Sequence, residues 1–183
     1  INLTDYRVTP PHEVLEAARR LAADRGLVVT GSEIVGVVPF EALLASGQYY
    51  LRKQGRSLGQ PASDVLRVAV ASLGLTDVAP FEIDKKVLGL PVVPDKALVR
   101  KTVVDFTDEV SRDSPAPGGG SVAALAGALG AALASMVANL TFAKEGTESR
   151  DADLARIAEE AQRIKASLLT AVDADSDAFT GFM

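Results

Sequence analysis

The chain has 183 residues, of which 48% are hydrophobic and 23% charged, and its formal net charge is −5. These values are typical of one or two globular domains with apolar cores and exclude a disordered chain. The sequence has no cysteine and one histidine, which excludes disulfides, thiolate zinc sites and clusters of histidine ligands. We therefore expect no bound metal, and the acidic balance disfavours nucleic acid as a partner.

The charge is divided unevenly along the chain. Residues 1–98 contain 11 basic and 11 acidic side chains, whereas residues 99–183 contain 8 and 13 and carry the whole net charge. The aliphatic residues also change, from mixed Val, Leu and Ile to mostly Ala and Gly. Both changes predict two domains or parts of two. Because the chain begins on Ile1 in a strand-like run and ends at Met183 inside a helical pattern, we expect a piece of a longer protein.

The first half predicts a small sheet with helices packed on it. Alternation of apolar and polar residues indicates a strand over 1–8, and Thr9 followed by Pro10 indicates a helix start. That helix should end near Arg25, with Gly26 as its stop. The expected strands are 1–8, 27–30 and 33–38, the last two joined by a hairpin turn at Gly31-Ser32, and the expected helices are 10–25, 40–53 and 62–73.

His12 is the sole histidine and has two interpretations. As a functional group it would be a catalytic base, but no serine or aspartate arrangement nearby supports that role. As a structural group it is a first-turn helix residue beside two prolines, and this interpretation is favoured.

Two prolines and a glycine between residues 89 and 95 predict an extended connection between domains. We place an α/β domain at 1–90, a linker at 91–98 and a helical domain at 99–183. The fold class is then α+β followed by an all-α helical bundle, with both domains incomplete.

The second half predicts helices at 98–112 and at 122–143. The latter is rich in small residues, and no charge occurs between Asp113 and Lys144, so a membrane span has to be considered. It contains few strongly inserting residues, and no basic cluster marks a cytoplasmic side. We therefore favour a buried central helix of a bundle and expect no membrane span.

A glycine run precedes this helix and comprises Pro117, Gly118, Gly119, Gly120 and Ser121. A dinucleotide fingerprint would need a strand before the glycines, and a Walker A loop would need a following lysine, so both are disfavoured. Backbone N–H groups at a helix start, with Ser121 as the cap, can bind an anion or closely approach a flat ligand. The alternative is a tight turn between helices.

The residue pattern of the last helix predicts a seam, that is, a line of positions facing a partner helix, and this seam contains one carboxylate. Its apolar positions alternate three and four residues apart and include Asp175, whereas Asp173 and Asp177 fall off the seam and should meet water. Burial of Asp175 would raise its pKa toward the range useful for proton transfer. The alternatives are a register change or an aspartate that caps the backbone of another helix. The seam consists of Leu154, Ile157, Ala161, Ile164, Leu168, Ala171, Asp175, Ala178 and Phe182.

Six segments, three in each half of the chain, carry a resemblance to known families. The runs 113–124 and 130–137, together with the acidic motif at 172–179, resemble the start of the formiminotetrahydrofolate cyclodeaminase and methenyltetrahydrofolate cyclohydrolase family. The runs 2–6, 30–39 and 72–81 are similar to the C-terminal subdomain of glutamate formiminotransferase. In this order the two halves resemble the bifunctional formimidoyltransferase-cyclodeaminases.

The resemblance implies a two-step folate reaction late in histidine breakdown. A formimino group passes from N-formimino-L-glutamate to tetrahydrofolate, and cyclodeamination then gives 5,10-methenyltetrahydrofolate and ammonia. It also implies that Asp175 is the cyclodeaminase acid, that the glycine run accepts folate, and that Gly31, Ser32, Glu33 and Gly36 are folate candidates in the transferase half.

Further expectations follow from the resemblance. Tetrahydrofolate, in polyglutamated form, would be a substrate, and the protein would be a cytoplasmic homo-oligomer. The transferase histidine belongs to a subdomain that these residues do not match, so we expect the chain alone to catalyse little. Two alternatives stay open, a methenyltetrahydrofolate cyclohydrolase and a non-catalytic helical assembly module.

Overall fold

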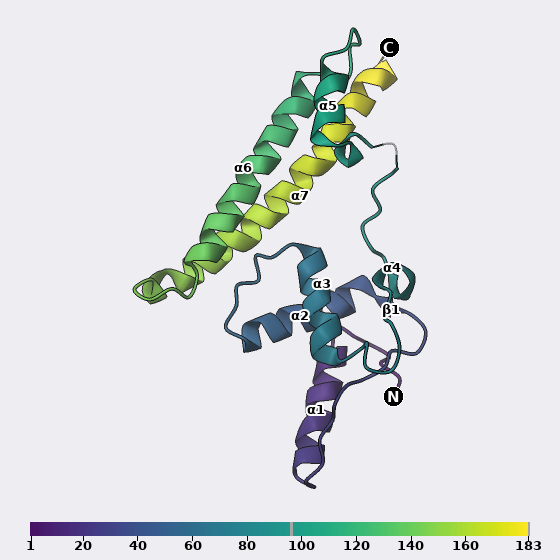
Figure 1. Ribbon diagram of the computed structural model, residues 1–183, viewed down its shortest axis with the longest axis vertical. Coiled ribbons are helices and arrows are strands. Elements are labelled where there is room, and N and C mark those ends of the chain that lie inside the picture. The colour runs from purple at the N-terminus through teal and green to yellow at the C-terminus, as the bar shows by residue number, and fades with distance from the viewer. Residues whose placement is uncertain (96, 183) are drawn as a thin grey trace. The chain divides into compact units, whose positions relative to one another are not determined.

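Figure 1 shows the computed structural model, which describes residues 1–95 and 97–182. The chain divides into two compact units, Ile1–Pro91 and Val92–Met183. The first combines helices with a small sheet and the second is helical, which confirms the predicted fold class. The two units are described separately below.

The N-terminal unit contains four helices and two short strands in its described residues. The helices α2 (Phe40–Lys53) and α3 (Ala62–Leu73) have the predicted bounds. The strands pair in parallel, with Val38 opposite Val87 and Pro39 opposite Leu88. The remaining elements are α1 (Pro11–Ala23), β1 (Val38–Pro39), α4 (Ile83–Lys86) and β2 (Val87–Leu88).

The strands predicted at 1–8, 27–30 and 33–38 are wrong except at Val38. Residues 5–9 form a turn in which the carbonyl of Asp5 accepts from the amides of Val8 and Thr9, and Gly31-Ser32 is not a hairpin turn. Alternation reports which side chains favour burial, but a strand also needs a neighbour for its backbone groups. Among the described residues only 38–39 and 87–88 find one another.

The start of α1 also differs by one residue from the prediction. Pro10 is the N-cap and Pro11 the first helical residue, so Thr9 lies outside the helix. The helix ends at Ala23, two residues before the predicted end. Gly26 has φ +70° and lets the next amide, that of Leu27, donate to the carbonyl of Ala22.

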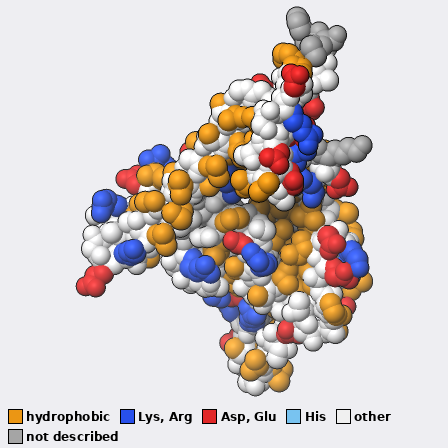
Figure 2. Space-filling view, turned by 45° about the horizontal axis from the view of Figure 1, so that its top comes forward, with side chains coloured by type: hydrophobic (Ala, Val, Ile, Leu, Met, Phe, Trp, Pro, Cys, Tyr) orange, Lys and Arg blue, Asp and Glu red, His pale blue; other side chains and the backbone are white. Residues whose placement is uncertain are grey.

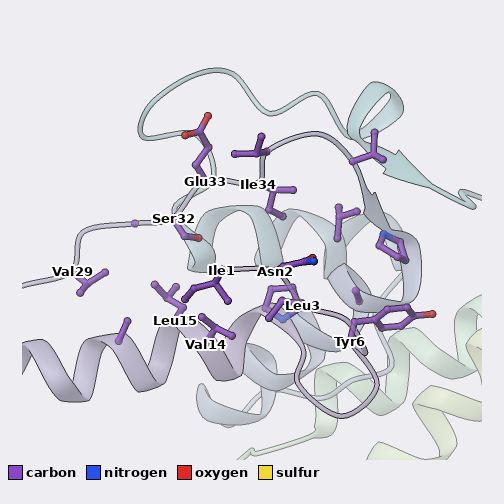
Figure 3. Close-up of a pocket in the computed structure, with 18 residues that line it drawn as sticks. Ile1, Asn2, Leu3, Tyr6, Val14, Leu15, Val29, Ser32, Glu33 and Ile34 are labelled. Atoms are coloured by element: carbon purple, nitrogen blue, oxygen red, sulfur yellow. The ribbon is translucent and has the colours of Figure 1, made fainter.

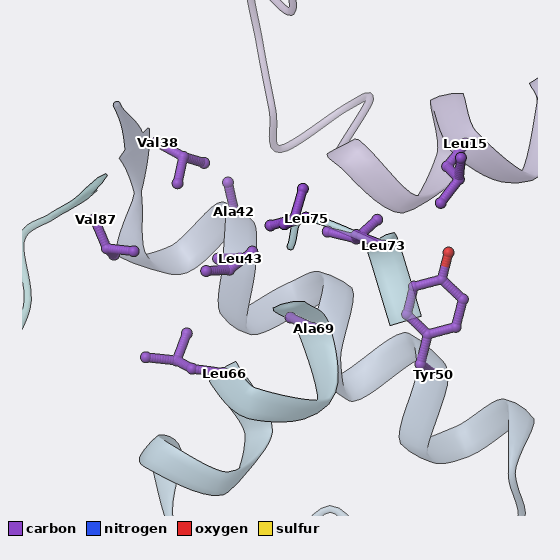
Figure 4. Packing of buried hydrophobic residues seen from close by; sticks show 10 residues of the cluster. All are labelled: Leu15, Val38, Ala42, Leu43, Tyr50, Leu66, Ala69, Leu73, Leu75 and Val87. Atoms are coloured by element: carbon purple, nitrogen blue, oxygen red, sulfur yellow. The ribbon is translucent and has the colours of Figure 1, made fainter. Parts of the chain in front are cut away.

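The core of this unit lies mainly between α2 and α3. Leu43, Ala69 and Leu73 are almost wholly buried and belong to a cluster of ten apolar side chains (Figure 4). Gly47 allows the helices to approach closely, because a Cβ there would lie 2.1 Å from the carbonyl oxygen of Val65.

Glu16 ties α1 to α2 through a buried charge. Its carboxylate accepts from Arg19 at 2.8 Å, from the Tyr50 hydroxyl at 3.2 Å and from the ammonium of Lys53. The bond from Lys53 is the main cause that lowers the pKa of Glu16 to about 2, against the opposing effect of burial. Burial, and then the charge of Glu16, raises the pKa of Tyr50 to about 12.

His12 lies in the same contact between α1 and α2. Its ring stacks on Tyr49 at 4.3 Å between centroids, and Nδ1 is 3.2 Å from the Ser46 hydroxyl oxygen. Burial lowers the pKa of His12. These contacts support the structural interpretation of this histidine.

The C-terminal unit is built on two long helices that run side by side (Figure 1), α6 (Gly119–Thr141) and α7 (Asp151–Phe182). The helix predicted over 98–112 is instead a 3₁₀ turn, η1 (Leu98–Arg100), followed by α5 (Val103–Val110). Thr102 separates the two, because its hydroxyl accepts from the amide of Asp105 and caps α5. A second 3₁₀ turn, η2 (Glu148–Arg150), precedes α7.

One face of α6 packs on α7, and another is open. Ala128, Ser135 and Ala138 are buried, whereas Leu129 and Leu133 are 60% and 58% exposed. Hydrophobic side chains are correspondingly visible at the molecular surface (Figure 2). The expectation of a helix buried on every side is therefore not met within the described residues. By length and composition alone α6 could also cross a membrane, which is weak evidence for a span.

Replacing Glu16 with Gln should destabilise the N-terminal unit by about 1–3 kcal/mol at pH 7, because the donors of Lys53 and Arg19 lose a charged acceptor. The lowered pKa of Glu16 contributes stability that is complete above about pH 4.5 and is lost as the pH falls toward 2. Thermal unfolding of the whole chain, followed by circular dichroism at pH 3, 5 and 7, should show a smaller acid-induced loss in Glu16→Gln than in the wild type. Glu13→Gln, at an exposed position of α1, is the control. Equal pH dependence in Glu16→Gln and wild type would contradict the assignment.

Candidate functional site

The glycine run forms the start of α6. Gly118 is the N-cap with extended backbone, and Gly119, Gly120 and Ser121 are the first helical residues. Ser121 is therefore not the cap of its own helix, and α6 begins three residues earlier than predicted. The helix starts here because Gly118, which follows the buried Pro117, takes the extended conformation that a cap requires.

Asp175 of α7 meets this helix start directly. Its Oδ2 atom accepts from the backbone amide of Ser121 at 2.9 Å and lies 3.3 Å from the Ser121 hydroxyl oxygen. The amides of a first helical turn have no acceptor within their own helix, so a carboxylate from a neighbouring helix satisfies one of them. Two segments that the sequence separates by 54 residues thus form one site.

Gly120 leaves the space that the Asp175 carboxylate occupies. A Cβ at residue 120 would lie 2.1 Å from Oδ1 of Asp175 and 2.6 Å from Oδ2. No side chain larger than hydrogen fits while the carboxylate stays in place. At Gly119, in contrast, no atom lies within 4 Å of the corresponding position.

Ser121 is fully buried, and its hydroxyl is directed to α7. The hydroxyl donates to the carbonyl of Val172 at 2.7 Å and lies 3.2 Å from the hydroxyl oxygen of Ser176. These contacts orient the side chain toward Asp175 rather than toward solvent. Ser121 thus supports the carboxylate, while Gly119 and Gly120 are the exposed residues of the run.

The prediction that Asp175 is buried and Asp173 solvated is wrong. Asp175 is exposed despite its bonds to Ser121, and Asp173 is partly buried because it accepts from the amides of Leu98 and Val99. Asp177 is exposed as expected. The geometry agrees with the alternative in which an aspartate caps the backbone of another helix. Helical spacing could not have shown either contact, because the donors are backbone amides of distant segments.

The seam of α7 also differs in detail from the predicted register. Ala161 is buried as expected, but Ile157 and Ile164 are 43% and 42% exposed. The most buried positions are Ala158 and Val172, which the 3-4 alternation did not include. The buried positions of α6 carry the small side chains of Ala128, Ser135 and Ala138, so α7 can approach closely and the contact line leaves out the larger Ile157 and Ile164.

The N-terminal unit contains a separate cavity of about 550 Å³ (Figure 3). Gly31, Ser32 and Glu33 line it together with residues 1–3 and with apolar side chains of α1, whereas Gly36 is not among the lining residues. The Ser32 hydroxyl donates to the carbonyl of Leu73 at 2.8 Å. Gly31 also has a packing role, because a Cβ there would lie 2.8 Å from the carbonyl oxygen of Gly74.

Titratable residues in the described part of the chain form no group of three or more that could hold a metal ion. The site at the start of α6 accordingly offers a carboxylate and backbone amides as its chemical groups. These groups can bind a cation, accept hydrogen bonds and move a proton.

Comparison with known proteins gives matches over both units. Residues 1–92 match the formiminotransferase domain, and residues 102–183 match the formiminotransferase-cyclodeaminase domain. The chain belongs to the formiminotransferase-cyclodeaminase family. This confirms the resemblance inferred from the glycine run and the acidic motif.

The relatives differ in how much of this chain they align with. It is 38% identical to the formimidoyltransferase-cyclodeaminase of Sus scrofa over the full chain and 39% identical to that of Mus musculus over 97% of it. A methenyltetrahydrofolate cyclohydrolase of Methylorubrum extorquens is 39% identical over 45% of the chain and 40% of its own length. The chain spans about a third of the length of the two formimidoyltransferase-cyclodeaminases, 34% and 33% respectively.

Replacing Gly120 with Ala should displace Asp175 and break its bond to the amide of Ser121. Amide hydrogen exchange at Ser121 should then accelerate by about tenfold or more. Gly119→Ala is the matched control, because its Cβ meets open space and alanine favours the helix by up to about 1 kcal/mol. Unchanged Ser121 exchange in Gly120→Ala would show that the carboxylate does not depend on this space.

Proposed function

We propose that this chain belongs to a folate-dependent enzyme that transfers a formimino group from N-formimino-L-glutamate to tetrahydrofolate and then closes the product to 5,10-methenyltetrahydrofolate with release of ammonia. Two family segments in the corresponding order support the pair of activities. The observation that carries the second step is the contact between Asp175 and the glycine start of α6.

The cyclodeamination requires proton movement at a cationic centre. In the protonated 5-formimino group, N10 attacks the amidine carbon, the bond from that carbon to the terminal nitrogen breaks, and the N10 proton leaves with the nitrogen as ammonia. A carboxylate beside the amidine stabilises its positive charge and can carry the proton from N10 to the departing nitrogen. Asp175 is the residue that we assign to this role.

The geometry leaves Asp175 suited to both tasks. In the described part of the chain, hydrogen bonds reach only its Oδ2 atom, from the Ser121 amide and hydroxyl. Oδ1 is held against Gly120 on an exposed side chain, where a substrate nitrogen can approach. The bonds from Ser121 fix the carboxylate in advance, so little reorganisation is needed during the reaction.

The glycine run supports binding of the flat folate ring or of its anionic tail. Gly118 and Gly119 expose backbone at the positive end of α6, and no side chain blocks approach at Gly119. In the transferase half, the cavity lined by Gly31, Ser32 and Glu33 is of the size that accepts a small molecule. We retain Gly36 as a folate candidate on the resemblance alone.

Several broader properties belong to the same proposal. The folate substrate is polyglutamated, the enzyme works without a metal, and the protein is a cytoplasmic homo-oligomer. The 183 residues by themselves should have little transferase activity, because the resemblance implies that the transferase histidine belongs to a subdomain that these residues do not match. These properties rest on the resemblance.

A second candidate function is hydrolysis of methenyltetrahydrofolate. The similarity to the Methylorubrum extorquens cyclohydrolase, which covers part of the chain, favours it. The preceding formiminotransferase segment favours cyclodeamination instead. Release of ammonia from 5-formiminotetrahydrofolate, measured beside hydrolysis of the methenyl bridge, distinguishes the two.

Replacing Asp175 with Asn should reduce ammonia release by the full-length protein at least about 100-fold, because the amide cannot carry the proton or balance the amidine charge. Asp177→Asn makes the same charge change two residues away on an exposed position and should leave turnover within about twofold. Both variants should retain the oligomeric state of the wild type in analytical ultracentrifugation. Full activity of Asp175→Asn would refute its catalytic role and leave its contact with Ser121 a purely structural one.

Replacing Glu33 with Gln should raise the KM of the transferase step for tetrahydrofolate several-fold, if this cavity holds the folate. The reason is that a carboxylate lining the cavity accepts hydrogen bonds from the N–H groups of the folate ring more strongly than an amide does. Glu41→Gln, on an exposed position of α2 outside the cavity, is the control and should leave KM unchanged. An unchanged KM in Glu33→Gln would remove this residue from the proposed folate contacts.

A further inference from the structure

Asp173 makes a contact that its position in the sequence does not suggest. Its Oδ1 atom accepts from the amide of Leu98 at 2.5 Å, and Oδ2 accepts from the amide of Val99 at 3.4 Å. The partners lie 75 and 74 residues earlier in the chain. The carboxylate is partly buried, so this is not a loose surface contact.

The segment that Asp173 holds is the end of the connection that leads into the helical unit. Leu98–Arg100 forms a single 3₁₀ turn, and its N-cap Ala97 makes no side-chain cap bond. The first amides of such a turn need an external acceptor, and the two oxygens of Asp173 supply it. The Arg100 guanidinium donates to the carbonyl of Val93 at 2.9 Å, which brings these two residues together.

The side chains of Asp173 and Asp175 make hydrogen bonds on opposite sides of α7. Two residues correspond to a rotation of about 200° around a helix axis, so the two side chains leave the helix in nearly opposite directions. Asp173 accepts hydrogen bonds from amides of η1, and Asp175 accepts one from the amide of Ser121 at the start of α6. Val172, beside them, is fully buried and its carbonyl accepts from the Ser121 hydroxyl. A rotation of α7 about its own axis would therefore strain the hydrogen bonds of both aspartates.

We propose that Asp173 is a positioning residue for cyclodeamination, which fixes the rotation of α7 that presents Asp175 to the glycine start of α6. The inference rests on the proposed function of Asp175. It also links η1 to the site, because release of Leu98 and Val99 frees one of the two sides on which α7 is held.

Two substitutions of Asp173 in the full-length protein test the proposal. Asp173→Ala removes both acceptors, whereas Asp173→Asn keeps one acceptor oxygen without the charge and should have an intermediate effect. Asp177→Asn is the control for loss of charge on the same stretch of α7. Each variant is measured by amide hydrogen exchange at Leu98, Val99 and Ser121 and by kcat and KM for ammonia release.

Asp173→Ala should accelerate exchange at Leu98 and Val99 and also at Ser121, and should lower kcat about tenfold with KM changed less than twofold. Asp177→Asn should change none of these. Faster exchange at Leu98 and Val99 with unchanged Ser121 exchange and unchanged kcat would overturn the proposal, since Asp173 would then only hold η1.

The two proposals can fail separately. If Asp175→Asn retains full activity, the catalytic role of Asp175 fails, while the exchange rate of Ser121 in Asp173→Ala still decides whether the two contacts are coupled. If Asp175→Asn loses activity and Asp173→Ala keeps both wild-type turnover and Ser121 protection, only the positioning role of Asp173 is refuted.

Discussion

The hydrogen bond from the Ser121 amide to Asp175 is the contact on which the helical unit and its candidate site both depend. It satisfies a backbone donor that α6 cannot satisfy itself, and it brings the glycine run and the acidic motif together. The small residues of α6 make it possible, because a close approach of α6 and α7 is needed before a short aspartate side chain can reach across. The packing of α6 on α7 and the chemistry of the candidate site thus share one geometric requirement. The backbone of α6 must carry no side chain at Gly120, where it faces the carboxylate of Asp175.

The sequence predicted the parts of the fold that depend on local information. The bounds of α2 and α3 follow from apolar periodicity and from the prolines before them, and the structure reproduces both. The strands failed because alternation within 1–8 and 27–38 says nothing about which segment lies alongside. Of these residues only Val38 is in a strand, since its partner at Val87 lies close enough to pair.

The sequence predicted which residues form the candidate site better than it predicted how they are arranged. The glycine run and Asp175 stand out in the sequence because they interrupt otherwise regular helical patterns. The structure brings them into contact. Burial of Asp175 and exposure of Asp173 were inferred from a seam that the structure shifts toward Ala158 and Val172. The shift occurs because contact with a small-residue helix selects close backbone approach over large side chains, and spacing alone cannot express that preference.

Gly120 and Asp175 occupy one shared volume, and this has a consequence for how the protein can change over evolutionary time. Any single substitution at residue 120 adds atoms where the carboxylate stands, so it is tolerated only after the aspartate has been shortened or lost. Loss of the aspartate alone, however, leaves an empty space and an unsatisfied amide at Ser121. Substitutions at these two positions are therefore constrained to occur together, and descendants that have lost one of the pair are free to lose the other.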